Sequence, residues 1–221
     1  MSSEPLEAVL FDLDGTLLDT APDFARVLNH MLAERDMPAL PYDRIRATVS
    51  HGARALVELA FAVKDGEPGF APLRSRLLSL YEAGLAIETT PFDGIRALLG
   101  HLGARGIAWG VVTNKPHYLA EPLMAAMGFD PAAAVLVCPD HVSRTKPDPE
   151  PLLLACRLIG CSPGASVYVG DHARDIEAGR RAGMHTIAAA WGYLAEGESA
   201  DVWEANQIAR SVPELQDILL N

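Results

Sequence analysis

The sequence predicts an α/β protein in which a block of helices interrupts a parallel sheet after its first strand. Two observations carry this prediction. Short apolar runs alternate with helical patterns in the later part of the chain, whereas the segment before it has helical patterns without a convincing strand. Strand–helix alternation is typical of parallel sheets with right-handed crossovers. We therefore expect a core of residues 1–18 and 91–221 and an inserted helical cap of residues 19–90.

The expected strands are short apolar runs that would be buried on both faces of the sheet. The first begins at Val9 and leads directly into Asp12. The later ones are Trp109–Val112, Val135–Cys138, Val167–Val169 and Thr186–Ala189.

Apolar residues at helical spacing mark the segments between these strands and within the cap. In the core they cover residues 95–102 and 152–159, and glycines follow where these helices should end. In the cap, Thr20-Ala21-Pro22-Asp23 has the composition of a helix start. Further cap helices are expected at Asp43–Val49, Ala53–Phe61 and Leu73–Leu85.

Composition and charge restrict the function. The chain has 221 residues, 49% hydrophobic and 21% charged, which is ordinary for a globular protein of this length. A formal net charge of −11 disfavours nucleic acid and anionic membranes as partners. An anionic substrate would need a local cation or a lysine to overcome that field.

Signals for targeting and for disulfides are weak. Cys138, Cys156 and Cys161 form an odd set without a C-x-x-C pair, which favours neither a disulfide framework nor a thiolate zinc site. The N-terminal residues lack a signal-peptide pattern, and no apolar run approaches the ~18 residues of a membrane span. We expect a cytoplasmic protein and leave the choice between monomer and homodimer open.

The most specific feature of the sequence is Asp12-Leu13-Asp14-Gly15-Thr16, directly after the first predicted strand. Two carboxylates this close repel each other, so they need a cation or a proton between them. Asp12 can attack phosphorus as a nucleophile. Asp14 can protonate the leaving oxygen and then deprotonate the attacking water. The pair therefore indicates metal-assisted chemistry on an anionic substrate.

Polar residues also follow the other predicted strands. Ligands of open parallel sheets bind beyond the carboxyl ends of the strands, so these residues should converge with the acidic pair. Mg²⁺ accepts carboxylate and carbonyl oxygens, and its expected ligands are Asp12, Asp14 and Asp171. Asp175, one helical turn later, is expected to orient these ligands. The groups expected to bind the phosphoryl oxygens are Thr113, Asn114 and Lys146.

Simpler structural roles stay open for several of these residues. Asp12 and Asp14 could cap a turn, although the other polar strand ends argue against it. The pair Thr113–Asn114 could form an ordinary turn. Asp175 could merely favour a helix N-terminus, which competes evenly with the orienting role.

His51 and Arg54 are the candidate specificity residues of the cap. They lie in a break between helical patterns that could face the catalytic edge. An arginine can pair with a substrate carboxylate through two hydrogen bonds. A surface arginine at a helix start is an equally good interpretation of Arg54, and His51 is similarly ambiguous.

The motif set resembles the haloacid dehalogenase (HAD) superfamily of phosphohydrolases. Four segments carry the resemblance: DLDGT at 12–16, VVTN at 111–114, TKPDPEP at 145–151 and VGD with a later aspartate at 169–175. It implies a Rossmann-like core, dependence on Mg²⁺ and an aspartyl-phosphate intermediate. The helical insertion is similar to the small cap of that superfamily.

Within the superfamily the chain resembles phosphoglycolate phosphatases, through TNKP at 113–116 and GDHARDIEAGRRAGM at 170–184. It is also similar to N-acetylmuramic acid 6-phosphate phosphatases, through WGVVTNKP at 109–116 and CPDHV at 138–142. One departure is His172-Ala173-Arg174, where a small polar residue and asparagine are common in the family.

The sequence thus favours Mg²⁺-dependent hydrolysis of a small phosphate monoester, with phosphoglycolate as the first candidate substrate. A phosphatase of N-acetylmuramic acid 6-phosphate in cell-wall recycling is the alternative, and a phosphosugar mutase would share the same core chemistry. A dehalogenase is disfavoured because halide displacement has no need of Asp14. A phosphate-sensing module without activity would be easier to accept if one of the core groups were missing.

Overall fold

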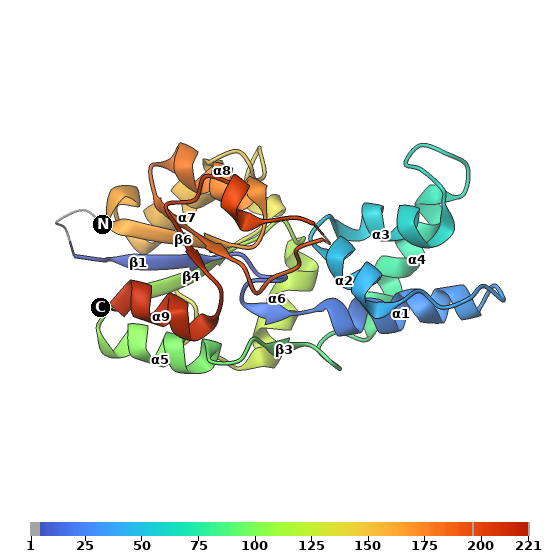
Figure 1. The fold of residues 1–221 in the computed structure, drawn as a ribbon, viewed down its shortest axis with the longest axis horizontal. Helices are drawn as coiled ribbons and strands as arrows, with labels where there is room; N and C mark the ends of the chain where they lie inside the picture. Colours follow the sequence, from blue (N-terminus) through green and yellow to red (C-terminus); the bar gives the residue numbers. More distant parts are fainter. Residues whose placement is uncertain (1–4, 196, 221) are drawn as a thin grey trace.

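The computed structural model describes residues 5–195 and 197–220, and these residues form a six-stranded parallel sheet (Figure 1). The strands lie in the order β5-β4-β1-β6-β7-β8, with parallel pairing throughout. The predicted parallel α/β sheet is therefore confirmed. The strands are β1 (Ala8–Phe11), β4 (Ala108–Val112), β5 (Leu136–Val137), β6 (Ser166–Gly170), β7 (His185–Ala189) and β8 (Gln207–Ala209).

Two strands differ from the sequence prediction. β5 is shorter than the expected Val135–Cys138. It ends before Cys138 because the Cys138 amide donates to Nδ1 of His141, whereas the Val135 carbonyl still accepts from the Val111 amide of β4. β8 was not expected, because its three residues are too few to form a periodic pattern. Its place at the sheet edge comes from parallel pairing with β7.

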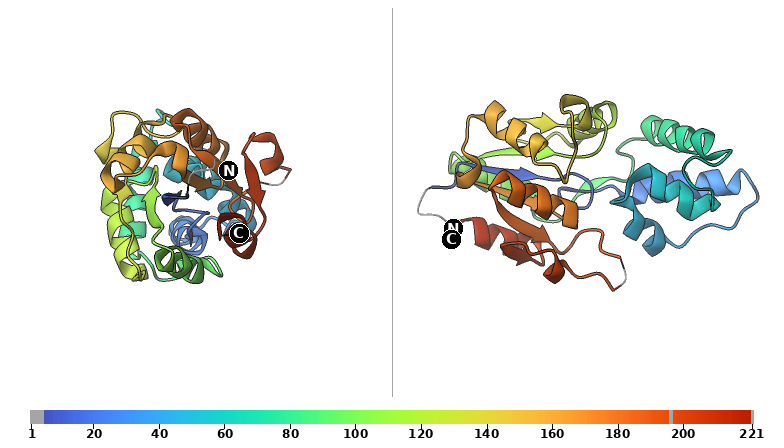
Figure 2. Two further views of the ribbon diagram at one scale, coloured as in Figure 1. Left: turned by 90° about the vertical axis from the view of Figure 1, so that its left-hand side faces the viewer. Right: turned by 90° about the horizontal axis from the view of Figure 1, so that it is seen from above.

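Helices cover both faces of the sheet because side chains alternate along each strand. Val9 and Phe11 of β1 pack on the side of α5, α6 and α9, whereas Leu10 packs on the side of α7 and α8. Figure 2 shows the two helical layers. The helices are α5 (Ile95–Ala104), α6 (His117–Met127), α7 (Glu150–Ile159), α8 (Ala173–Ala182) and α9 (Val212–Leu220), with short 3-10 turns at Pro139–His141, Pro163–Ala165 and Ala200–Val202.

The chain between β1 and α5 forms a helical block at the end of the sheet away from the termini (Figure 1). Its apolar faces meet in a second cluster, which includes Phe24, Leu28, Leu56 and Tyr81. Leu119 of α6 also belongs to this cluster. The block consists of α1 (Ala21–Ala33), α2 (Tyr42–Val49), α3 (Gly52–Phe61) and α4 (Phe70–Ala83). α4 starts before the expected Leu73, because Gly69 takes a left-handed φ of 94° and turns the chain into the helix.

Two short strands, β2 (Leu18–Asp19) and β3 (Thr90–Pro91), pair antiparallel where the chain enters and leaves the helical block. This ladder differs from the sequence analysis, which expects no strand in that segment. It forms because the entering and leaving segments run side by side. The division into core and cap stays a prediction, and residues 1–4, 196 and 221 of the predicted core lie outside the described residues.

A buried aspartate reinforces this junction. Asp23, in the first turn of α1, accepts hydrogen bonds from Thr89 Oγ1 at 2.7 Å and from the Thr89 amide at 3.0 Å. It also pairs with Arg26 at 2.7 Å. The start of the helical block is thus tied to its exit. Across the described residues, no helix is both long and apolar enough to cross a bilayer.

Candidate active site

The carboxyl ends of the central strands bring Asp12 and Lys146 together. Asp12 follows β1, and its amide donates to the Val169 carbonyl of β6 at 2.9 Å. Lys146 arrives from the loop before α7, and its Nζ lies 2.9 Å from Asp12 Oδ1. Lys146 also donates to Asp175 Oδ1 at 2.7 Å and to the Tyr168 hydroxyl at 2.8 Å. Asp12, Lys146, Tyr168 and Asp175 are all buried. The ammonium of Lys146 therefore balances the negative charge of the carboxylates in a place that bulk water does not reach.

Burial and pairing act in opposite directions on these charges. Burial opposes ionisation of Asp12, but the Lys146 ammonium, with smaller help from Arg174 and the Leu13 amide, holds the pKa of Asp12 below its usual value. Burial likewise opposes the charge on Lys146, and its two carboxylate partners raise the Lys146 pKa. Burial dominates at Asp175, whose pKa lies above its usual value. Asp12 is therefore ionised at neutral pH, as a carboxylate nucleophile must be.

Three carboxylates form a cluster beside this lysine. Oxygens of Asp12, Asp171 and Asp175 lie within 4.8 Å of one another, which is close enough to share one cation. Asp171 accepts hydrogen bonds from Thr16 Oγ1 at 2.9 Å and from the Tyr193 amide at 3.0 Å. Burial and the two neighbouring carboxylates raise the pKa of Asp171 to about 7. A cation among these oxygens would relieve their repulsion.

The glycine of the DLDGT motif makes room for this cluster. Gly15 has a φ of +85°, and a Cβ there would lie 2.2 Å from Asp171 Oδ2. A side chain is thus excluded both by the backbone conformation and by the close approach of Asp171. The loop after β1 therefore passes directly against the strand end that carries Asp171.

Asp14 is directed away from the three carboxylates. Its Oδ1 accepts a hydrogen bond from Thr20 Oγ1 at 2.6 Å and lies 2.9 Å from Lys115 Nζ. The Asp14 side chain thus lies outside the group that could share a cation, although the sequence predicts Asp14 as a metal ligand. Its assignment as a ligand stays a prediction.

Lys115, for which the sequence pattern predicts no role, joins the core to the helical block. Its Nζ donates to the Tyr81 hydroxyl at 3.0 Å and lies 5.1 Å from the centre of the Phe24 ring. The two rings stack with their centroids 4.0 Å apart. Burial opposes the charge on Lys115, but the neighbouring Asp14 and Tyr81 raise the pKa of Lys115 above its usual value. Burial raises the pKa of the Tyr81 hydroxyl to about 12. The segment TNKP at 113–116 contains this lysine and resembles the family, but the sequence alone does not show that the lysine is buried.

Thr113 and Asn114 follow β4 and border the same cavity as Asp12. The Thr113 amide donates to Val137 of β5, and Thr113 Oγ1 accepts from the Lys115 amide at 3.1 Å. The Asn114 side chain instead holds the Lys146 loop, with contacts to the Lys146 carbonyl at 3.0 Å and amide at 3.2 Å. The hydroxyl of Thr113 can still donate to a ligand, while the Asn114 amide is engaged in positioning Lys146.

The cavity that these residues border has a volume of about 320 Å³ and lies between the strand ends and the helical block. Asp12, Asp14, Thr113 and Asn114 form its floor together with Lys115, and residues 49–54 contribute from the helical block. Lys146 and Asp171 do not line the cavity, although Lys146 Nζ contacts Asp12 and an Asp171 oxygen lies within 4.8 Å of an Asp12 oxygen. The site therefore opens toward the helical block.

The two predicted specificity residues differ in their placement. His51 lies at the cavity, with its ring 5.2 Å from the ring of His172. Arg54 also lines the cavity, but its side chain is 65% exposed and lies 3.7 Å from Glu58. Arg174 was not assigned a role from the sequence. It lines the cavity, donates to the Ser50 carbonyl and keeps a buried Nε without a partner among the described residues.

Comparison with known proteins identifies the family. The sequence profile of the haloacid dehalogenase-like hydrolases matches residues 9–189. This chain belongs to the haloacid dehalogenase-like hydrolases. The match includes the polar residues at the strand ends of the site, from Asp12 to Asp175, so these residues lie within the family's shared region.

The curated relatives of this hydrolase carry phosphatase names. N-acetylmuramic acid 6-phosphate phosphatase of Pseudomonas aeruginosa is 47% identical over 97% of this chain and 95% of its own. Phosphoglycolate phosphatase of Xanthomonas campestris pv. campestris is 43% identical over 94% of each chain. Among solved structures, a protein of Haemophilus somnus described as a predicted phosphoglycolate phosphatase matches with a TM-score of 0.85, at 23% identity and over 98% and 99% of the two chains.

Proposed function

We propose that this hydrolase cleaves phosphate monoesters with the aid of Mg²⁺, through a phosphoryl group carried by Asp12. The observation that carries the proposal is the buried Asp12 carboxylate, 2.9 Å from Lys146 Nζ, in the lining of a cavity that also presents Asp14 and Thr113. The phosphatase names of the curated relatives support it. So does CbbY of Rhodobacter sphaeroides, whose crystal structure contains phosphate and matches at 25% identity with a TM-score of 0.74 over 95% and 96% of the two chains.

The residues of the site fit a magnesium ion. Hard oxygens of Asp12, Asp171 and Asp175 lie within reach of one cation. Asp12 Oδ1 is buried, and although Lys146 Nζ is 2.9 Å away, no described group gives it a hydrogen bond of good angle. Asp175 already binds Lys146, so we assign ligation to Asp12 and Asp171 and orientation to Asp175. When bound, the ion would neutralise charge on the phosphoryl oxygens.

Asp14 would contribute to the metal through its main chain. Its carboxylate contacts Lys115 and Thr20 and lies outside the group of oxygens that could share one cation, so we assign the side chain to proton transfer. A carbonyl oxygen is also an acceptable magnesium ligand. This division lets one residue serve both roles that the sequence predicts for it.

The proposed reaction has two steps. A carboxylate oxygen of Asp12 attacks phosphorus, the bond to the ester oxygen breaks, and Asp14 gives a proton to the departing oxygen. Asp14 then takes a proton from water, whose oxygen attacks phosphorus and releases the Asp12 carboxylate and phosphate. Lys146 keeps Asp12 ionised before the first step. The Thr113 hydroxyl donates to a phosphoryl oxygen as negative charge builds there.

The candidate substrates are small phosphate esters that bear a carboxylate. N-acetylmuramic acid 6-phosphate and phosphoglycolate, named for relatives at 47% and 43% identity, both have one. The free cysteines among the described residues are compatible with the cytoplasmic location expected from the sequence. A phosphosugar mutase would give an isomerised hexose phosphate in place of free phosphate.

Phosphate release tests the proposal. Purified protein with Mg²⁺ should release phosphate from at least one of a panel of sugar, nucleotide and carboxylated phosphate esters. A chelator should abolish release, and added Mg²⁺ should restore it. Asp12→Asn should lower kcat by at least about a thousandfold while the melting temperature stays close to that of the unchanged protein. The proposal would fail if no ester released phosphate, or if Asp12→Asn kept its turnover.

A further inference from the structure

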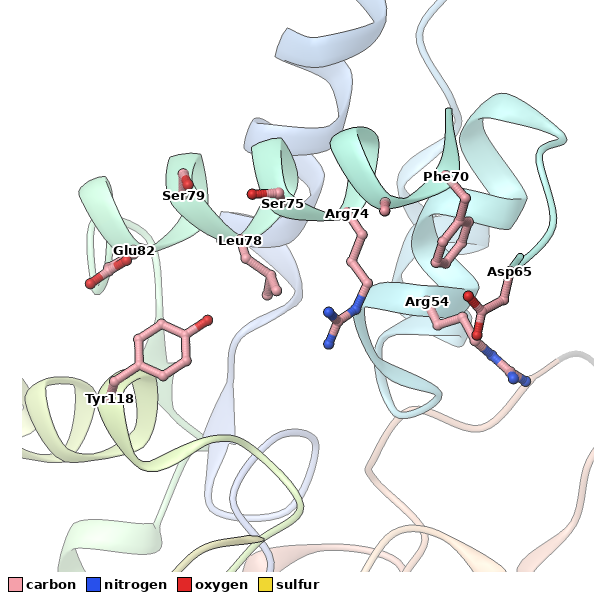
Figure 3. A pocket seen from close by; sticks show the side chains of 10 residues that line it. Arg54, Asp65, Phe70, Arg74, Ser75, Leu78, Ser79, Glu82 and Tyr118 are labelled. Carbon is pink, nitrogen blue, oxygen red and sulfur yellow. The ribbon is translucent and has the colours of Figure 1, made fainter. Parts of the chain in front are cut away.

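A second cavity continues the candidate active site along α4. The cavity that borders Asp12 measures about 320 Å³, and its neighbour measures about 500 Å³. Both are lined by Arg54, Arg74 and Leu78, so the two cavities meet at these residues. Figure 3 shows the second cavity between α4 and Tyr118, which lies at the start of α6. An ester whose phosphate contacts Asp12 can therefore extend the rest of its structure into this space.

The lining of the second cavity suits a polar molecule with a ring. The exposed Tyr118 offers aromatic surface, and the largely buried Phe70 also borders the cavity. Ser75, Ser79 and Glu82 offer hydroxyl and carboxylate groups. Pockets that join apolar surface to a few polar groups orient ligands with both kinds of surface, and a sugar has both. A two-carbon acid such as phosphoglycolate would leave this cavity empty.

The two arginines where the cavities meet differ in their partners. Arg54 lies 3.7 Å from Glu58, and its guanidinium in Figure 3 is turned toward Asp65 and away from Arg74. The Arg74 guanidinium points from α4 into the space between Leu78 and Arg54 (Figure 3). Among the described residues, no carboxylate lies within ion-pair distance of Arg74. Arg74 is thus the better placed of the two to bind an incoming anion.

We propose that Arg74 binds a carboxylate on the part of the substrate beyond the phosphate, and that the cavity between α4 and α6 holds that part. The proposal rests on the proposed phosphatase function and makes its substrate class more specific. The substrate is a phosphate monoester of a hydroxyl-rich ring that bears a carboxylate. A guanidinium binds a carboxylate through two parallel hydrogen bonds, which also fixes its orientation. In a chain of net charge −11, such a local cation is needed to attract an ester that carries both a phosphate and a carboxylate.

Matched esters and matched variants test this role. N-acetylmuramic acid 6-phosphate is compared with N-acetylglucosamine 6-phosphate, which has the same sugar ring without the lactyl carboxylate. Arg74→Ala is compared with Arg76→Ala, whose guanidinium on the same helix binds Glu34 at 2.8 Å and does not line the cavity. The readout is kcat/KM for each ester with each protein.

Arg74→Ala should lower kcat/KM for the carboxylate-bearing sugar phosphate by about tenfold to 100-fold more than for the matched sugar phosphate. Arg74→Lys should recover part of the loss, because the charge is kept and the forked geometry is not. Arg76→Ala should leave both values within about twofold of the unchanged protein.

Three outcomes would overturn the proposal, and they have different meanings. If Arg74→Ala lowers kcat/KM equally for the two sugar phosphates, Arg74 does not bind the substrate carboxylate. If kcat/KM is higher for phosphoglycolate than for either sugar phosphate, the second cavity does not hold part of the substrate. In both cases the unchanged protein still releases phosphate, so the phosphatase function stands. Absence of phosphate release from every ester, p-nitrophenyl phosphate included, would instead contradict the phosphatase function itself.

Discussion

The candidate active site contains two buried lysines, and each pairs with one acid of the DLDGT motif. Lys146 lies within the α/β core and contacts Asp12. Lys115 also comes from the core and contacts Asp14, but Tyr81 of α4 encloses its ammonium from the helical block. The surroundings of the proposed nucleophile are therefore built by the core, whereas those of the proposed acid and base need both parts of the molecule.

This difference links proton transfer to the docking of the helical block. Ser50, in the connection between α2 and α3, donates to Asp171 Oδ2 at 3.1 Å, and Arg174 returns a contact to the Ser50 carbonyl. The same docked arrangement brings Tyr81 onto Lys115. Closure of such a segment can exclude water and complete a catalytic arrangement together. We expect changes at Lys146 to act on the nucleophile and changes at Lys115 to act on the proton donor.

Loss of Lys146 should have the largest effect. Lys146→Met leaves the buried carboxylates of Asp12 and Asp175 without their cation, so kcat should fall by at least about a thousandfold. The free energy of unfolding should fall by about 3–5 kcal/mol. Phosphate release and urea denaturation measure the two effects. Lys64→Met, in an exposed loop, is the control. A kcat within tenfold of the unchanged protein would show that Asp12 does not depend on this lysine.

Loss of Lys115 should have a smaller effect that depends on the leaving group. Lys115→Met removes the contact that holds Asp14, so hydrolysis of an alkyl phosphate should slow by about 100-fold, within the range of general acid–base catalysis. The kcat/KM for p-nitrophenyl phosphate should fall less, because kcat/KM reports the first step and this leaving group needs little help from an acid there. The ratio of the two kcat/KM values is the readout. An equal fall in kcat/KM for both esters would show that Lys115 does not act on proton transfer to the leaving group.

Loss of the Asp23 charge should affect stability more than chemistry. Burial opposes ionisation of Asp23, but hydrogen bonds from Arg26 and Thr89 hold its pKa below the usual value. A depressed folded-state pKa contributes stability above the unfolded-state pKa, and this contribution is lost as the pH falls through the folded-state value. Asp23→Asn should therefore cost about 2 kcal/mol near pH 7.

The same linkage fixes the pH dependence of that cost. Denaturation at a series of pH values measures the free energy of unfolding of the unchanged protein and of Asp23→Asn. The two free energies should converge as the pH falls below about 4, where the carboxyl of the unfolded chain begins to hold its proton. If the difference between the two free energies of unfolding stays constant down to pH ~3, the charge of Asp23 is not what holds α1 to the exit of the helical block.

Much of the sheet and of the acidic site could be predicted from the sequence. Residues that follow parallel strands meet at one edge of the sheet, so their positions depend mainly on the order of the strands. Asp12, Thr113 and Lys146 are examples. Lys115 and Arg74 could not be assigned in this way. Their surroundings depend on how α1 and α4 pack on the core, and Lys115 meets Tyr81 from 34 residues away in the chain. The direction of the Asp14 side chain is also set by Thr20 and Lys115, which the strand pattern does not reveal.

The most direct test of the division between the two acids uses Asp14→Asn with Mg²⁺ and p-nitrophenyl phosphate. The good leaving group should let Asp12 be phosphorylated without an acid, while the second step should stall because no base activates water. After an acid quench and digestion, mass spectrometry should find close to one phosphoryl group per protein, on the peptide that contains Asp12. A protein without a covalent phosphoryl group, or with one on another residue, would contradict Asp12 as the nucleophile and Asp14 as its acid and base.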